Sequence, residues 1–121
     1  NGVKYLYDLA NTLNINNSVR MTNDPLVGDM VFFDNTTGPN HPLNHMGIVV
    51  AGPNSNGMVT FVHATANVGV YNSKMNILKS SDAKENDFIG NFCAKGTGDP
   101  ACLAGNLFSG YGTVRDPKTL K

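Results

Sequence analysis

The sequence has few charged residues and no excess of either sign. Charged side chains make up 15% of the 121 residues, with nine Lys and Arg against nine Asp and Glu, so the formal net charge at pH 7 is zero. A chain without net charge has no overall field that would draw it to a polyanion. This balance argues against nucleic acid and anionic membrane surfaces as partners.

Long apolar runs are also missing. No run approaches the roughly 18 apolar residues of a membrane span, so the sequence predicts none. The Gly-x-Ser-x-Gly motif of serine hydrolases is absent as well. Asn, Ser, Thr and Gly supply much of the polarity, a composition common in exported bacterial proteins. The length fits one small domain, and Asn1 opens the chain as it would in a mature or trimmed product.

Cysteine is scarce: the chain contains two, Cys93 and Cys102, at the ends of CAKGTGDPAC. The Gly, Pro and Asp residues between them favour a loop that bends back, and we expect a disulfide to close it, worth about 2 to 3 kcal/mol on loop-entropy reasoning. A disulfide implies an oxidising compartment, which predicts a secreted or periplasmic protein. The alternatives are two unpaired thiols, or a nucleophilic Cys102 at the start of a short helix, CLAGNLF.

The spacing of apolar residues changes along the chain. The segment VKYLYDLANTLNI, residues 3–15, follows i, i+3, i+4, i+7 spacing and predicts an amphipathic helix. From Asp24 onward the pattern is that of strands, and a turn cluster over Pro53–Gly57 predicts a β-hairpin. The sequence therefore predicts an α+β fold, an N-terminal helix followed by an antiparallel sheet of about five strands. The expected strands span residues 30–33, 46–51, 58–64, 68–72 and 109–116, and the polar segment 77–88 is left as a loop or a short helix.

Two histidines are expected to meet at one end of that hairpin. Pairing the arms around the turn sets Met46 opposite about His63, so His45 and His63 lie across from one another. Two imidazoles on neighbouring strands suit a relay in which one takes a proton and the other fixes its tautomer and orientation. A single histidine on a strand is more often structural, and the adjacency of the two is what favours a functional role.

His41 allows a second interpretation of the histidines. The segment HPLNH spaces His41 and His45 by four residues, and His63 could complete a three-histidine zinc site. Pro42 and the neighbouring Gly-Pro-Asn favour an irregular loop over the helix that this spacing requires. In DNTTGPN, Asp34 is the only carboxylate, so a solvated turn is a better interpretation than a calcium site. We therefore expect no metal and no cofactor.

The ordered segments LVGDMVFFD, HMGIVV and TFVHAT, the last followed by Gly-Val, resemble the core signature of the NlpC-type cell-wall peptidases and their CHAP-domain relatives. The resemblance covers residues 24–70, and the closing LAGNLFSGYGTV is similar to the ending of some CHAP-like secreted bacterial proteins. It implies a papain-like fold, in which a helix with a cysteine at its N-terminal end packs on an antiparallel sheet that carries the base. By motif, His45 matches the catalytic histidine and His63 matches the third, orienting polar residue.

The resemblance also implies an activity. In that family a thiolate attacks an amide carbonyl, an acyl-enzyme forms, and water releases it. Backbone donors near the cysteine hold the oxyanion, and the usual substrates are the peptide stems or cross-links of bacterial peptidoglycan. This chain departs from the family at the nucleophile, because the family's Asp-Cys-Ser-Gly-like motif precedes the strand that begins near Gly28, and no Cys stands before Gly28 here.

We therefore expect residues 1–121 to form a single domain, the C-terminal, base-bearing part of a cysteine amidase or endopeptidase, incomplete at its N-terminus. The expected partners are a peptidoglycan peptide and either the missing N-terminal fragment or a second copy, since the apolar sheet face that the cysteine helix normally covers would otherwise be open. The alternative is a non-catalytic module that binds cell-wall peptides on the same sheet.

Overall fold

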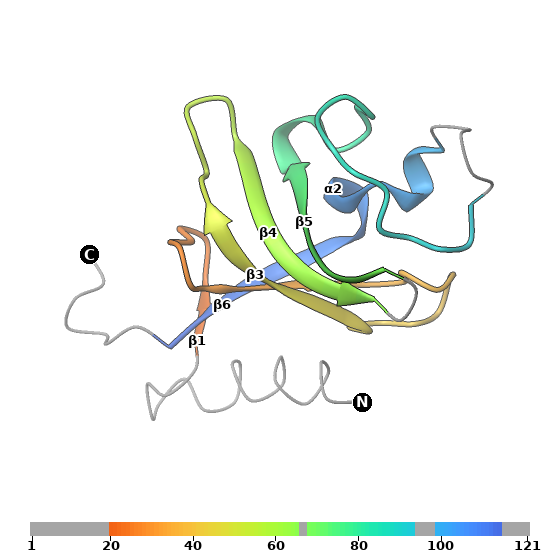
Figure 1. Ribbon diagram of the computed structural model, residues 1–121, viewed down its shortest axis with the longest axis horizontal. Coiled ribbons are helices and arrows are strands. Elements are labelled where there is room, and N and C mark those ends of the chain that lie inside the picture. The colour runs from red at the N-terminus through yellow and green to blue at the C-terminus, as the bar shows by residue number, and fades with distance from the viewer. Residues whose placement is uncertain (1–19, 66–67, 94–98, 115–121) are drawn as a thin grey trace.

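One antiparallel sheet dominates the structure, a computed structural model that describes residues 20–65, 68–93 and 99–114. Within these ranges the sheet has six strands in the order β1-β6-β2-β3-β4-β5 (Figure 1). The strands are β1 Arg20–Thr22, β2 Met30–Phe33, β3 His45–Ala51, β4 Met58–Thr65, β5 Gly69–Asn76 and β6 Phe108–Thr113. The helical elements in the described part are η2 Ile77–Lys79, η3 Pro100–Cys102 and α2 Ala104–Leu107, none of them long and apolar enough to cross a membrane.

Alternation along the strands decides which face of the sheet forms the core. Successive side chains of a strand point to opposite faces, so every second residue enters the same layer. In β4 the buried members are Val59 and Phe61, and in β3 Val49 joins them. The core cluster consists of Val31, Phe33, Val49, Val59, Phe61, Met75, Ile89, Ala104, Leu107 and Tyr111.

The chain between β5 and β6 covers this core face. It supplies Ile89, Ala104 and Leu107 to the same apolar cluster as the strands. Figure 1 shows that the covering segment is mostly irregular, with α2 beside β5. An irregular cover has few hydrogen bonds of its own, so its backbone groups need side-chain partners where they are buried.

Asn86 provides four such partners from a single side chain. Its Oδ1 accepts hydrogen bonds from the backbone N–H groups of Asn76 at 2.8 Å and Gly105 at 2.9 Å. Its Nδ2 donates to the carbonyl oxygens of Lys79 at 2.8 Å and Asp82 at 3.1 Å. Because the side chain is 1% exposed, these bonds join the end of β5, the η2 turn and α2 inside the protein.

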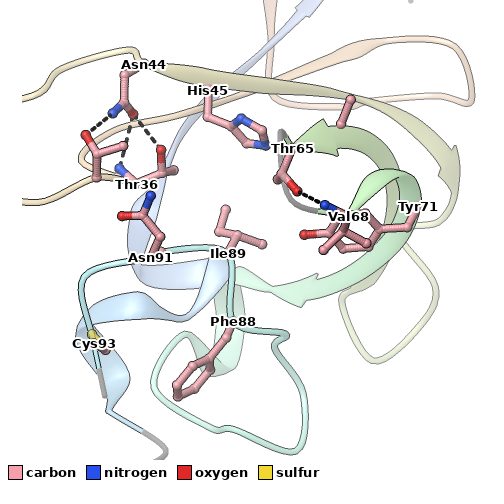
Figure 2. Close-up of a pocket in the computed structure, with 13 residues that line it drawn as sticks. Thr36, Asn44, His45, Thr65, Val68, Tyr71, Phe88, Ile89, Asn91 and Cys93 are labelled. Atoms are coloured by element: carbon pink, nitrogen blue, oxygen red, sulfur yellow. Dashed lines mark hydrogen bonds between the residues drawn. The ribbon is translucent and has the colours of Figure 1, made fainter. Parts of the chain in front are cut away.

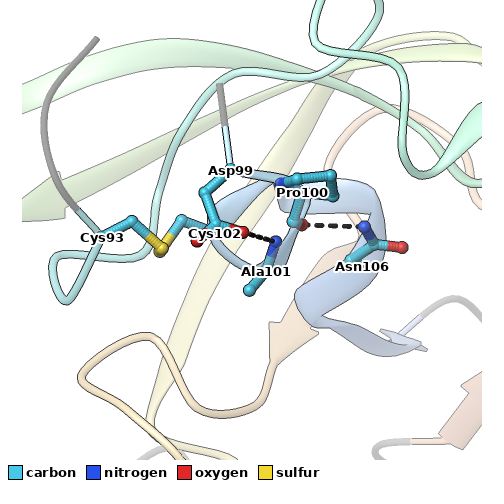
Figure 3. Close-up of a disulfide and its surroundings, with 6 residues drawn as sticks. All are labelled: Cys93, Asp99, Pro100, Ala101, Cys102 and Asn106. Carbon is cyan, nitrogen blue, oxygen red and sulfur yellow. Dashed lines mark hydrogen bonds between the residues drawn. A yellow bond between two sulfur atoms is a disulfide. The ribbon is translucent and has the colours of Figure 1, made fainter. Parts of the chain in front are cut away.

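The two cysteines are joined, as the sequence suggested, in a disulfide that anchors η3. Cys102 is fully buried, and its carbonyl oxygen accepts hydrogen bonds from the N–H groups of Ile89 and Gly90. The carboxylate of Asp99 accepts from Ala101 N–H and so caps the η3 turn (Figure 3). Gly90 packs so closely here that a Cβ on it would lie 2.9 Å from the Sγ of Cys102. The disulfide thus links Cys93, in the segment that follows β5, to Cys102 at the end of η3, just before α2 begins.

The predicted fold class is wrong. The described residues form a mostly-β protein in which the helices are single turns, so the α+β, papain-like arrangement of a helix packed on a sheet is not what the structure has. The expected helix over residues 3–15 lies outside the described residues. The core face is instead covered by an irregular segment, which is held by the side chain of Asn86 and by backbone hydrogen bonds such as those of Ile89 and Gly90 to Cys102 O. The extra strand is β1, whose three residues give no alternation to recognise.

Replacing Asn86 by Ala is expected to destabilise the protein by about 2 to 4 kcal/mol, because one buried and three partly buried backbone groups would lose their partner at once. Urea unfolding followed by circular dichroism measures the change. Asn72→Ala is the matched control, since Asn72 is exposed on β5, and it is expected to stay within about 0.5 kcal/mol of the wild type. Equal stabilities for Asn86→Ala and Asn72→Ala would contradict the role given to Asn86.

Candidate functional site

His45 and His63 come together on one face of the β3–β4 hairpin. The pairing of Ile48 with Val62, continued by one residue, sets Gly47 opposite His63. His45 then lies two residues along the same face, diagonal to His63. A Cβ on Gly47 would lie 2.8 Å from Val62 O and 2.9 Å from Cδ2 of Phe61, so the glycine allows β4 and the Phe61 ring to pack closely at this position.

A chain of hydrogen bonds runs from His45 through His63 to a serine. Nε2 of His45 lies 2.7 Å from Nδ1 of His63, and Nε2 of His63 lies 2.8 Å from Oγ of Ser73 on β5. The two rings meet edge to face, with centroids 5.0 Å apart. His63 is 4% exposed and Ser73 3%, whereas His45 is only partly buried. The chain therefore leads from the edge of the core to its interior.

Burial lowers the pKa of both imidazoles. For His63 the pKa falls to about 4, first because the ring is buried, and further because a protonated His45 repels a second positive charge. The carboxylate of Asp87 acts in the opposite direction and only partly offsets these effects. For His45, burial alone lowers the pKa. Both rings are neutral at pH 7, the state in which an imidazole accepts a proton.

Two proton arrangements satisfy the His45–His63 hydrogen bond. In the first, Ser73 donates to His63 Nε2 and His63 Nδ1–H donates to His45 Nε2, so His45 carries its own proton on Nδ1. In the second, His45 Nε2–H donates to His63 Nδ1 and His63 Nε2–H donates to Ser73, so His45 Nδ1 keeps a free lone pair. The second arrangement makes His45 a base at Nδ1, a nitrogen with no hydrogen bond in the described part of the chain. The second arrangement, in which Ser73 Oγ accepts from His63 Nε2–H, is the one that leaves His45 a free lone pair.

His45 lines a cavity of about 640 Å³ at the end of the sheet. In Figure 2 its ring lies on one side, with Ile89 and Phe88 below it and Tyr71 beside Val68 on the other side. One wall is polar, where Asn44 Oδ1 accepts from Thr36 N–H and Oγ1–H and Asn44 Nδ2 donates to Thr37 Oγ1. Among the lining residues that the structure describes, none is Asp, Glu, Lys or Arg: they are Thr36, Thr37, Asn44, His45, Ala64, Thr65, Val68, Tyr71, Phe88, Ile89, Gly90, Asn91 and Cys93.

No thiol of this chain is available to His45. Both cysteines lie in the disulfide, which rules out a nucleophilic Cys102 as long as that bond is intact, and Cys102 is fully buried. Ser73 is buried behind His63 and is bound to its Nε2, on the side away from His45. The cavity beside His45 therefore contains no free thiol among the residues that the structure describes.

The metal interpretations find no support in the geometry. Nδ1 of His41 points to its own loop, 2.9 Å from the carbonyl oxygen of Pro39 and 3.2 Å from that of Gly38. Among residues 20–65, 68–93 and 99–114, no three His, Cys, Asp or Glu side chains are grouped to hold an ion. The carboxylate of Asp34 accepts from Leu43 N–H at 2.7 Å and so closes the loop that carries His41.

Comparisons with protein-family models, with curated proteins and with solved structures found no match to this chain.

Ser73 and Tyr71 are the site residues that sequence reasoning missed. Tyr71 pairs with His63 across the β4–β5 ladder, and its ring centroid lies 4.3 Å from that of His63. Ser73 lies two residues further on the same face. The segment VGVYN was recognised as a strand, but placing Ser73 needs the strand to run on to Asn76 and needs its register with β4. Neither follows from the alternation of so short a segment.

Ser73→Ala is expected to change the tautomer of both histidines. Without Oγ, a proton on His63 Nε2 would be a buried donor with no partner, so the proton moves to Nδ1 and His45 loses its free lone pair. The ¹⁵N chemical shifts of the imidazole nitrogens report the tautomers directly. Ser73→Thr keeps a hydroxyl and is expected to keep the wild-type shifts. Identical spectra for wild type and Ser73→Ala would refute this positioning role.

Acid is expected to destabilise the protein through His63. Its folded pKa of about 4 lies below the usual value of 6.5, so between these values the unfolded chain binds a proton that the folded protein does not. The free energy of unfolding therefore falls as the pH drops through this window, by up to about 3 kcal/mol, and is unaffected above it. Urea titrations from pH 7.5 to 4.5 measure the effect. His63→Gln should flatten this dependence and His41→Gln should not, and a similar slope in all three proteins would contradict the assignment.

Proposed function

We propose that this domain is the base-bearing part of a cysteine amidase or endopeptidase that hydrolyses peptide bonds of bacterial peptidoglycan. The observation that carries the proposal is the hydrogen-bonded chain from His45 through His63 to Ser73, which opens on an uncharged cavity. The motifs around His45 and His63 resemble those of cell-wall peptidases and support the substrate class. The disulfide is in keeping with a secreted or periplasmic protein.

In this proposal His45 is the general base and His63 orients it. Nδ1 of His45 takes the proton of a thiol supplied from outside the 121 residues, and the thiolate attacks the carbonyl carbon of the scissile amide. The imidazolium then returns that proton to the leaving amine as the tetrahedral intermediate collapses to a thioester. Water, deprotonated by the same nitrogen, hydrolyses the thioester and frees the thiol. Throughout these steps His63, itself bonded to Ser73, holds the His45 ring through the hydrogen bond at His45 Nε2.

The test uses the polypeptide encoded by the full reading frame, incubated with purified peptidoglycan. His45→Ala is expected to lower the release of new amino groups by about 10² to 10⁴-fold, the usual contribution of a positioned base. His41→Ala, in the loop nearby, is the matched control and should retain wild-type release. Iodoacetamide should inhibit the wild type, because the nucleophile is a thiol. Hydrolysis that survives His45→Ala would sink the proposal.

A second function is favoured by one observation, that both cysteines of the chain are held in a disulfide. A module with the same cavity and no nucleophile would bind cell-wall peptides without cutting them. Sedimentation with purified sacculi separates the two proposals. A binding module would co-sediment as the 121-residue chain and would leave the peptidoglycan intact. The polypeptide encoded by the full reading frame would then show no hydrolysis that iodoacetamide inhibits.

A further inference from the structure

β5 forms the outer edge of the sheet beside the cavity, and the outward backbone groups are hydrogen-bonded in only one half of this strand. β5 is the last strand in the sheet order, so one side of its backbone faces away from β4. Lys74 marks that side, because its N–H donates to Asp87 Oδ2 at 3.0 Å and its carbonyl oxygen accepts from Asp87 N–H at 3.0 Å. In an antiparallel ladder every second residue presents its backbone groups to the same side, so Asn72 and Val70 face outward as Lys74 does.

The C-terminal half of this edge is already paired. The outward N–H of Asn76 donates to Asn86 Oδ1, and Lys74 is occupied by Asp87. In the N-terminal half, Val70 is 75% exposed and Asn72 is exposed as well. No hydrogen bond within the described ranges occupies the outward backbone groups of either residue. Such open donors and acceptors are the template on which an added strand pairs.

The open half of β5 borders the cavity. Tyr71, between Val70 and Asn72, is one of the residues that line it, and Phe88 lines it from the covering segment. Asn86 and Asp87 lie against the edge of β5 at Asn76 and Lys74, and the next residue, Phe88, pairs with Leu103 instead. The edge at Val70 and Asn72 is thus left open on either side of Tyr71, which lines the cavity together with His45.

We propose that an extended peptide with small, uncharged side chains pairs with Val70 and Asn72 as an added strand. Its backbone pairs with the outward groups of Val70 and Asn72, beyond the contact of Asp87 with Lys74, and the side chain opposite Tyr71 enters the cavity. The described lining residues include no Asp, Glu, Lys or Arg, which favours an uncharged side chain, because a charge placed against them would lose its hydration without a partner. The inference rests on the proposed function in taking this peptide as the substrate, but the pairing itself needs no catalysis.

Amide hydrogen exchange of the 121-residue chain, measured by NMR, tests the pairing. The probe is pentaalanine acetylated at the N-terminus and amidated at the C-terminus, at millimolar concentration. Its addition is expected to slow exchange of the Val70 and Asn72 amide protons and to shift the resonances of Tyr71 and His45. The same peptide with N-methylated second and fourth residues, which cannot form a ladder, is the control and should leave exchange at Val70 and Asn72 unchanged.

Val70→Pro removes one outward N–H without touching the β4–β5 ladder, a position where edge strands tolerate proline. It is expected to weaken binding of the probe by about three- to tenfold, the value of one hydrogen bond, whereas Val70→Thr keeps the N–H and should bind like the wild type. Should Val70→Pro fail to fold, the exchange data and the N-methylated peptide still decide.

Three results would overturn the inference. They are an absence of binding at millimolar peptide, resonance shifts around the cavity without protection of Val70 and Asn72, and protection that rises with protein concentration alone, which would assign the edge to a second copy of the chain. Failure of the proposed function is seen separately. Peptidoglycan hydrolysis would then be absent, or would survive His45→Ala, while the probe still protects the edge.

Discussion

The four hydrogen bonds of Asn86 are the constraint on which the site depends. An irregular segment crosses the core face of the sheet, and its buried backbone groups have neither a helix nor a ladder to satisfy them. One side-chain amide supplies two acceptor and two donor bonds, and it holds the end of β5, the η2 turn and α2 in one place. The same segment continues into Ile89, Gly90 and Asn91, a wall of the cavity. Asn86 thus fixes the covering segment three residues before Ile89, while the carbonyl oxygens of Cys102 and Thr36 hold the N–H groups of Ile89, Gly90 and Asn91.

The opposite wall has its own requirement, the absence of a side chain at position 47. A Cβ at this position would lie within 3 Å of Val62 O and of the Phe61 ring, so only glycine lets β4 and Phe61 pack this closely on β3. On the same face the diagonal pair His45 and His63 brings its nitrogens to 2.7 Å. Burial of His63 then follows from its place between Phe61 and Tyr71, whose rings lie 4.9 and 4.3 Å from it. Lowered pKa values are a consequence of this packing.

Features set by neighbouring residues could be predicted from the sequence, and features set by contacts between distant segments could not. The strand over residues 30–33 has the predicted bounds, and the hairpin brings His45 to His63, although its register differs by one residue and sets Gly47 and not Met46 opposite His63. The predicted fold class depended on a helix inferred from residues 3–15, which lie outside the described part. The residue pattern of 77–88 also does not predict an irregular segment that covers the core face and is held by Asn86. Ser73, the cavity and the half-open edge of β5 each depend on contacts between segments far apart in the chain, which periodicity does not report.

Burial of the pair also limits which nucleophile it can serve. A histidine with a lowered pKa is a weak base, and the imidazolium it forms would be a single charge in a cavity without charged lining residues. The desolvation cost of the imidazolium is offset only if an anion forms in contact with the ring in the same step. A thiol, with a pKa near 8.5, meets this condition far more easily than an alcohol, because the proton transfer yields a thiolate–imidazolium pair with no net charge. If His45 acts as the proposed base, the described lining of the cavity is therefore a poorer setting for serine or threonine chemistry than for a thiol.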